Sequence, residues 1–229
     1  MNFFESITNL FYPRVCVACG RSLFQWEYLV CTRCRALLPK TGYEMNAENP
    51  LARLFYGKVR LDAVTACFFF SKEGKVQRLI HELKYKGNKE AGFFLGVELG
   101  KTLKEAPLFQ GLDYLIPVPL HPRKEKKRGY NQSLMIAQGI SEVTNIPIRK
   151  DVLVRLVNTA TQTHKSKEER WNNVKDIFAV KHSELLEGKY VLLVDDVLTT
   201  GSTLEACALR LSDVKGIRIS CATAACAGS

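Results

Sequence analysis

One segment, residues 189–203, constrains the fold more than any other part of the chain. Its apolar run, 191–194, is short and contains β-branched residues, as expected for a strand that is buried on both faces. Two acids follow this run, then a loop of threonine, glycine and serine, and a helical pattern begins near Thr203. A buried strand that leads into a helix predicts an α/β fold, with a parallel sheet flanked by helices.

The polar residues after this strand indicate a site for a phosphorylated sugar. Ligands of open parallel sheets bind at the carboxyl ends of the strands, so Asp195 and Asp196 are expected to face a crevice and to accept hydrogen bonds from sugar hydroxyls. The loop offers hydroxyls and backbone N–H groups at a helix N-terminus, which favours a phosphate. The alternative is a strand exit with an ordinary turn and helix cap. The residues expected to hold the ligand are Val197, Leu198, Thr199, Thr200, Gly201, Ser202 and Thr203.

Two Cys-x-x-Cys pairs near the N-terminus form the second strong signal. Four thiolates at this spacing suit a tetrahedral zinc ion, and because four sulfur ligands leave no open position, the zinc is expected to be structural. Two disulfides are one alternative, and iron in the same sulfur cage is another. The expected ligands are Cys16, Cys19, Cys31 and Cys34.

The other four cysteines lie in apolar segments and show no metal-type spacing. They are expected to be buried as small hydrophobic residues. Paired and single cysteines together predict a reducing, cytoplasmic location. These four residues are Cys67, Cys207, Cys221 and Cys226.

Composition favours a globular protein with anionic partners. The chain of 229 residues is 46% hydrophobic and carries a formal net charge of +10, which suits a polyphosphate or a nucleic acid equally well. No apolar run is long enough to span a bilayer. Residues 1–11 place Phe3, Ile7, Leu10 and Phe11 on one helical stripe, which is expected to pack on the body of the protein; a membrane-surface helix is the alternative.

Along the chain we expect three parts. They are an N-terminal helix with a four-cysteine zinc module (1–38), a connector (39–60) and a main domain (61–229). In the main domain, apolar strands alternate with helical patterns, which again predicts a parallel sheet. The expected strands are 63–70, 113–118, 191–195 and 217–225, and the expected helices follow the patterns at 76–83, 90–104, 131–143 and 204–211.

Two polar loops interrupt this alternation. The first, 117–132, is basic, and its place after a strand would bring Arg123, Lys124 and Arg128 close to the acids, where a leaving pyrophosphate needs countercharge; a solvated loop is the alternative. The second, 155–173, is long enough for a lid that keeps water from a reactive sugar. Its His164 is expected to be a surface residue.

Taken together, the motifs resemble those of the ComF family, which joins a zinc finger to a type I phosphoribosyltransferase-like domain. They are the two Cys-x-x-Cys pairs, the Pro-x-Pro-Leu-His-Pro and Arg-Gly-Tyr-Asn-Gln stretches, the polar loop, and the segment with the paired acids. The last is similar to the family's phosphoribosyl pyrophosphate (PRPP) motif. The polar loop resembles the family's mobile loop through Arg155, Thr159, Gln162, Arg170 and Asn173.

The resemblance implies that PRPP binds together with Mg²⁺, and that Asp195, Asp196, Arg123 and Arg128 carry the chemistry. Arg155, Gln162 and Arg170 would complete the ligand site. The family context is natural competence and DNA uptake, and proteins of that machinery are expected partners. The motifs do not indicate which acceptor molecule an enzyme of this kind would use.

A second hypothesis makes the chain a non-enzymatic accessory of DNA uptake. The metal module and the basic residues, including Lys126 and Lys127, would grip single-stranded DNA through its phosphates. PRPP would then be a regulator, or its site a relic. A third role for the metal module is to brace the main domain or a protein partner.

Overall fold

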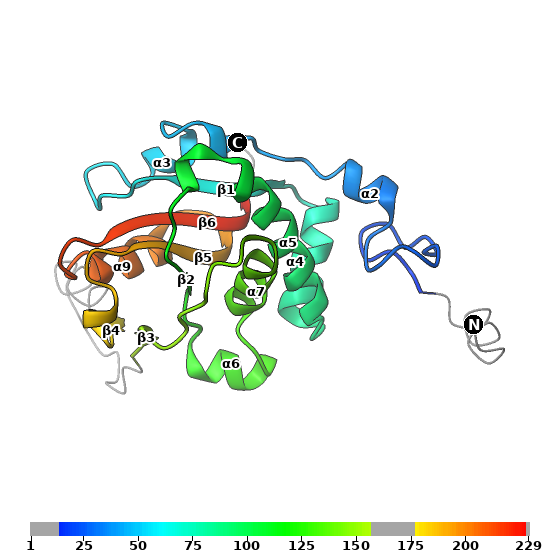
Figure 1. Ribbon diagram of the computed structural model, residues 1–229. Helices are drawn as coiled ribbons and strands as arrows, with labels where there is room; N and C mark the ends of the chain where they lie inside the picture. The colour runs from blue at the N-terminus through cyan, green and yellow to red at the C-terminus, as the bar shows by residue number, and fades with distance from the viewer. Residues whose placement is uncertain (1–13, 157–176, 228–229) are drawn as a thin grey trace.

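The computed structural model describes residues 14–156 and 177–227 of the chain. These residues form a four-stranded sheet in the order β1, β6, β5, β2, in which every neighbouring pair is parallel (Figure 1). The predicted parallel α/β fold is confirmed. The strands are β1 (Val64–Phe70), β2 (Tyr114–Pro117), β5 (Tyr190–Leu198) and β6 (Arg218–Ala227).

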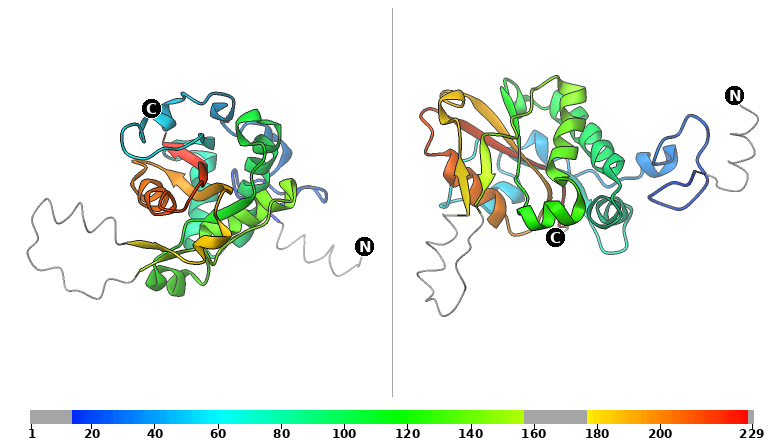
Figure 2. Two further views of the ribbon diagram at one scale, coloured as in Figure 1. Left: turned by 60° about the vertical axis from the view of Figure 1, so that its left-hand side comes forward. Right: turned by 90° about the horizontal axis from the view of Figure 1, so that it is seen from below.

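Helices cover both faces of this sheet (Figures 1 and 2). One face carries α4 (Lys75–Tyr85), α5 (Lys89–Glu105) and α7 (Gln132–Thr144). The other carries α9 (Ser202–Leu211), α3 (Pro50–Arg53) and a hairpin of β3 (Leu153–Arg155) and β4 (Phe178–Val180). Because both faces are covered, β5 is buried from residue 190 to residue 194, which explains its continuous apolar run.

The predicted helices are present. The four apolar residues that predicted α4 are all buried on one face, which is what helical spacing requires: Val76, Leu79, Ile80 and Leu83. Asn131 caps α7, since its side-chain oxygen accepts a hydrogen bond from the Ser133 N–H at 2.9 Å. The shorter elements are α2 (Thr32–Ala36), α6 (Pro122–Arg128) and the 3₁₀ helices Tyr43–Met45, Pro107–Phe109 and Ser183–Leu185.

Strand β5 runs further than predicted. Instead of ending at Asp195 it continues to Leu198, because Val197 and Leu198 stay in register with Ala225 and Cys226 of β6. Leu198 is buried, so packing as well as hydrogen bonding holds the extension. Both acids therefore lie within a hydrogen-bonded strand and not in a loop.

The basic segment 117–132 also differs from the prediction, because it contains the seven-residue helix α6. Pro122 starts this helix, and the His121 ring accepts a hydrogen bond from the Arg123 N–H at 3.2 Å. Gly129 ends it in the left-handed region, at φ 78°. Three cations in the last turn complement the helix dipole, so the charge run that indicated a loop stabilises a helix end.

The structure omits two regions that carried predictions. The stripe of Phe3, Ile7, Leu10 and Phe11 lies outside the described residues. So do Thr159, Gln162, His164, Arg170 and Asn173 of the polar loop. Arg155 is described, and it is the last residue of β3.

Residues 39–60 are hydrogen-bonded to the sheet. The Phe69 N–H donates to Pro39 O at 2.8 Å, and the Thr41 N–H donates to Cys67 O at 3.1 Å. Further on, Phe55 is buried, and its ring lies where a Cβ on Gly201 would come within 3.0 Å of it. The segment therefore covers the edge of β1 and supports the loop after β5.

The position of α7 depends on an unusually close approach to α5. A Cβ on Gly96 would lie 2.1 Å from Ile136 O, and a Cβ on Gly139 would lie 2.2 Å from Phe93 O. Only glycine at these two positions lets the backbones come so close. This contact sets where the first turn of α7 meets the sheet.

Two further expectations concern burial and membranes. Cys67, Cys207, Cys221 and Cys226 are all buried, as predicted. Across the two described ranges, no helix combines the length and the apolar character that crossing a bilayer would require.

Candidate functional site

The paired acids lie near the carboxyl end of β5, and each has a partner from another element. Asp195 Oδ1 accepts hydrogen bonds from Ser133 Oγ and from the Asp196 N–H, both at 2.8 Å. Asp196 Oδ1 lies 2.8 Å from Lys84 Nζ, in the last turn of α4. The site therefore joins β5, α4 and the first turn of α7.

The two carboxyl groups are not equivalent. Burial raises the pKa of Asp195 to about 7, and the charge of Asp196 contributes to the same rise. Hydrogen bonds from the Asp196 N–H and from Ser133, with the Lys84 charge, oppose it. Asp195 thus changes its charge near neutral pH, while Asp196 has a cation beside it.

The loop after β5 presents polar groups to solvent. Thr199, Thr200, Ser202 and Thr203 are exposed, and the Thr200 and Ser202 hydroxyls lie 3.0 Å apart. Gly201, at φ 80°, precedes α9 in the left-handed region and packs on Phe55. A helix N-terminus with exposed hydroxyls can receive a phosphate.

The predicted basic residues lie at different places. Arg128 donates a hydrogen bond to Gln132 Oε1 at 2.8 Å, and its guanidinium carbon lies 5.7 Å from the ring centroid of Tyr85, next to Lys84. Arg123 and Lys124 are exposed at the start of α6, and neither makes a hydrogen bond or ion pair with the acids in the described part of the chain. Arg155 lies over the ring of Phe178, at 5.3 Å from its centroid. The structure thus places Arg128 over Tyr85, the residue after Lys84, and leaves Arg123 in solvent.

Sequence reasoning missed Lys84, Ser133 and Gln132. Ser133 directly follows the basic segment, so its position close to the acids could have been inferred from the order of strands and helices. Lys84 gave no such signal, because it is one of many lysines. Gln132 is 1% exposed, and its side-chain nitrogen has no hydrogen-bond partner among the described residues, so it is a buried donor available to a ligand or water.

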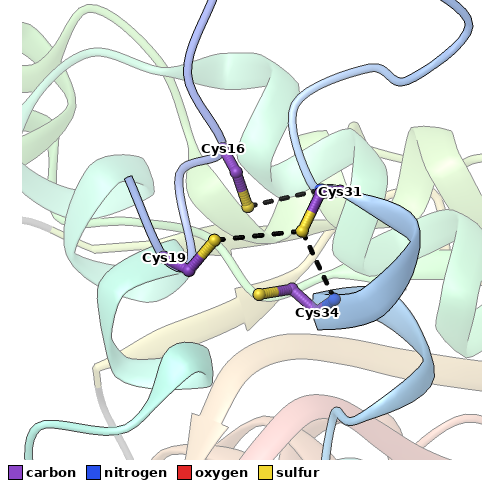
Figure 3. A group of neighbouring side chains, drawn as sticks. All are labelled: Cys16, Cys19, Cys31 and Cys34. Atoms are coloured by element: carbon purple, nitrogen blue, oxygen red, sulfur yellow. Dashed lines mark hydrogen bonds between the residues drawn. The ribbon is translucent and has the colours of Figure 1, made fainter. Parts of the chain in front are cut away.

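The four N-terminal cysteines converge on one point (Figure 3). Their sulfur atoms all lie within 4.8 Å of one another. Cys19 Sγ and Cys31 Sγ are 3.8 Å apart, close to the sulfur separation of about 3.8 Å that a tetrahedral site with 2.3 Å Zn–S bonds requires. These thiols can therefore hold one metal ion, and their chemistry fits zinc.

The disulfide alternative does not fit this geometry. The eight cysteines all lie in the described ranges and are free thiols, and an S–S bond would need a separation of about 2 Å. Backbone N–H groups instead point at two of the sulfur atoms: the Cys31 N–H donates to Cys16 Sγ at 3.3 Å, and the Cys34 N–H donates to Cys31 Sγ at 3.4 Å.

The cysteine module, residues 14–38, is fastened to α4 and α5. Arg35 forms a salt bridge with the buried Glu98 of α5. Arg78 of α4 donates to Ala18 O, inside the first cysteine pair, at 3.0 Å. A metal that orders the module would therefore also support these two helices.

The outer side of the module carries exposed aromatic rings. Phe24 and Trp26 are stacked, with centroids 4.9 Å apart and planes 4° from parallel. Trp26 is 78% exposed, and Phe24 and Tyr28 are each more than half exposed. Large aromatic rings in water indicate a binding surface.

Comparison with known proteins relates the C-terminal part of the chain to one family. A family model described as "Phosphoribosyl transferase domain" matches residues 130–229. That segment includes the acids, the loop and Arg155, but not Lys84 or the cysteines.

Three curated relatives match parts of the chain. "DNA utilization protein YhgH" of Escherichia coli O157:H7 is 34% identical over 129 residues, which are 55% of this chain and 56% of the relative. "Competence protein F" of Haemophilus influenzae is 41% identical over 92 residues, 39% of this chain and 40% of the relative. "Competence protein ComFC" of Bacillus subtilis is 37% identical over 90 residues, 39% and 34% of the two chains. The matches span about half the length of the relatives or less, and they confirm the resemblance to the ComF family.

We predict that the module binds one zinc ion per chain and that Cys34→Ser loses it. Cys226→Ala, at a buried cysteine far from the module, should keep the metal. Chelation should also lower the melting temperature, because Arg35 and Arg78 fasten the module to the body. Elemental analysis and thermal denaturation provide the measurements. Equal metal content in Cys34→Ser and the native chain would contradict the site, and iron in place of zinc would correct its identity.

Asp195 should make stability fall as pH rises. Its folded pKa of about 7 lies above the unfolded value of about 3.9, so between these values the folded state holds a proton that the unfolded state has lost. The contribution of Asp195 to the free energy of unfolding should therefore decrease from about pH 4 to pH 7 by on the order of 3 kcal/mol, then level off. Asp195→Asn should lack this decrease and be more stable than the native chain above pH 7.

Urea denaturation at several pH values measures this effect. Asp213→Asn, at an exposed carboxylate beyond α9, should keep the native profile. Parallel profiles for the native chain and Asp195→Asn would show that Asp195 titrates normally.

Proposed function

We propose that this chain, which matches a phosphoribosyl transferase family model over residues 130–229 and resembles competence proteins, binds PRPP with Mg²⁺ at the carboxyl end of β5. The proposal rests mainly on one observation: the two acids near the end of β5 are followed directly by the exposed, hydroxyl-rich N-terminus of α9. The proposed reaction is transfer of the phosphoribosyl group from its anomeric carbon, in the setting of DNA uptake that the names of the relatives indicate. The acceptor is the open part of this proposal.

Each part of the site has a role in this proposal. Asp195 and Asp196 would accept hydrogen bonds from the two ribose hydroxyls, and their negative charge would stabilise a sugar ring that becomes positive as pyrophosphate leaves. Residues 197–203 would hold the 5′-phosphate through backbone N–H groups and hydroxyls. Gly201 suits this because Phe55 leaves no room for a side chain there.

Cations would neutralise the negative charge of the leaving pyrophosphate. Arg128, which lies over the ring of Tyr85 beside Lys84, is the first candidate, and Arg123 would have to turn inward from the exposed start of α6. The acids offer the oxygen ligands that Mg²⁺ prefers, and the ion would neutralise pyrophosphate charge when bound. Arg155 together with Gln162 and Arg170 remains the proposed outer part of the site.

Calorimetry should detect Mg²⁺-dependent binding of PRPP to the native chain. Asp196→Asn should weaken it about ten- to hundredfold, since a hydrogen bond to a charged group contributes about 1.5–3 kcal/mol. Asp213→Asn should bind like the native chain. Absence of Mg²⁺-dependent heat in the native chain would refute the proposed ligand.

An assay of pyrophosphate release with a panel of nucleobases then tests the enzymatic part. Turnover should require both acids. Binding of PRPP without pyrophosphate release under any condition of the panel would remove the transferase claim and leave PRPP as a regulator.

A second candidate function, binding of single-stranded DNA, is favoured by the exposed rings of the cysteine module. Nucleobases stack on exposed aromatic side chains, and neighbouring guanidinium groups neutralise phosphates. Phe24 and Trp26 are already stacked, and Arg14 donates to Gln25 O, between them in sequence, at 3.2 Å. The net charge of +10 favours the same partner.

Trp26→Ala should weaken binding of an oligothymidine by about ten- to hundredfold, because stacking contributes about 1–3 kcal/mol per base. Tyr56→Ala, at an exposed ring in residues 39–60, is the matched control and should have little effect. Fluorescence anisotropy at several salt concentrations measures both. Binding that ignores salt, or that falls equally in the two variants, would argue against this surface.

A further inference from the structure

The last turn of α4 is fixed against the segment that leads into α7. Tyr130 donates a hydrogen bond from its hydroxyl to Leu83 O. The ring of Tyr85 lies beneath the Arg128 guanidinium. Lys84 is held between these two contacts, so its backbone has a defined place beside the acids.

Lys84 differs from an ordinary surface lysine. Its side chain is 22% exposed and that of Asp196 is 13% exposed, so most of this ion pair is shielded from solvent. Lys86, two residues further on, is 61% exposed and pairs with Glu82 on the helix surface at 3.0 Å. Such an exposed pair contributes little.

We propose that Lys84 is a placeholder cation, which occupies in the ligand-free protein the position at Asp196 that the ligand must take. This inference rests on the proposed function, since the incoming group is the Mg²⁺ that binds together with a phosphorylated pentose. Ligand binding then requires the Lys84 ammonium to leave Asp196. Lys84 lies outside the segment that matches the phosphoribosyl transferase family.

The chemistry of lysine suits this exchange. Its ammonium is a compact charge on a flexible four-carbon stem, so it can leave Asp196 while the fixed end of α4 stays in place. Without it, a partly buried carboxylate would have no countercharge before the ligand arrives. The released ammonium would remain on the same turn as Tyr85, whose ring lies beneath Arg128, and could serve the anionic part of the ligand.

Magnesium titration of the chain without PRPP tests the placeholder directly. Lys84→Met should bind Mg²⁺ about tenfold more tightly than the native chain, because the ion no longer competes with an ammonium for Asp196. Lys84→Arg, which keeps the charge, should stay near the native affinity. Lys86→Met removes an equal charge nearby and should change the affinity less than twofold. An unchanged or lower affinity in Lys84→Met, or an equal gain in Lys86→Met, would overturn the proposal.

A second measurement uses the native chain and does not depend on the folding of any variant. Reductive methylation, followed by mass spectrometry, should modify Lys84 slowly in the free protein and severalfold faster at saturating Mg²⁺. Lys86 should react at one rate throughout. An unchanged Lys84 rate would show that the ion does not displace it.

A PRPP titration separates this proposal from the proposed function. If the native chain fails to bind PRPP while Mg²⁺ still releases Lys84, the placeholder stands and the proposed ligand is wrong. If PRPP binds while Lys84→Met leaves Mg²⁺ affinity unchanged, the proposed function stands and the placeholder is wrong.

Discussion

The site depends on two adjacent carboxylates held within a strand of a sheet that is covered on both faces. Hydrogen bonding to β6 carries β5 past its apolar run, so neither Asp195 nor Asp196 can move into solvent to lower its energy. Each acid therefore needs a polar partner within the protein: the Ser133 hydroxyl donates to Asp195, and the Lys84 ammonium pairs with Asp196. The close contact of α5 with α7 at Gly96 and Gly139 brings Ser133 into place. The packing of α5 against α7 therefore also determines which polar group lies beside Asp195.

Much of the architecture could be predicted because its signals are local. Apolar runs and helical spacing gave the order of the main strands and helices, and the cysteine spacing gave a cluster that converges in space. The paired acids and Gly201 could be placed at the end of a strand because loop chemistry and strand pattern adjoin in the sequence. The roles of Arg123, Arg128 and Arg155 stay predictions, and the structure adds only their positions.

The remaining features depend on contacts between distant segments. Asp195 could not be expected to titrate near pH 7, because its burial arises from the packing of several elements. The end of β5 follows its partner strand and not its own composition, so the apolar pattern placed it too early. In α6, the local pattern was misleading because a run of cations is typical of a loop, whereas Pro122 and Gly129 define a helix. Nothing in the sequence around Lys84 indicates that it lies at the site.

The contact between Phe55 and Gly201 limits how far this protein can be treated as modular. The aromatic ring belongs to residues that precede the first strand of the sheet, while the loop that it supports belongs to the C-terminal segment that matches the family model. A C-terminal fragment without Phe55 would thus expose the side of Gly201 that this ring covers. A shortened or recombined version of this protein should therefore keep the segment around Phe55 together with the loop around Gly201.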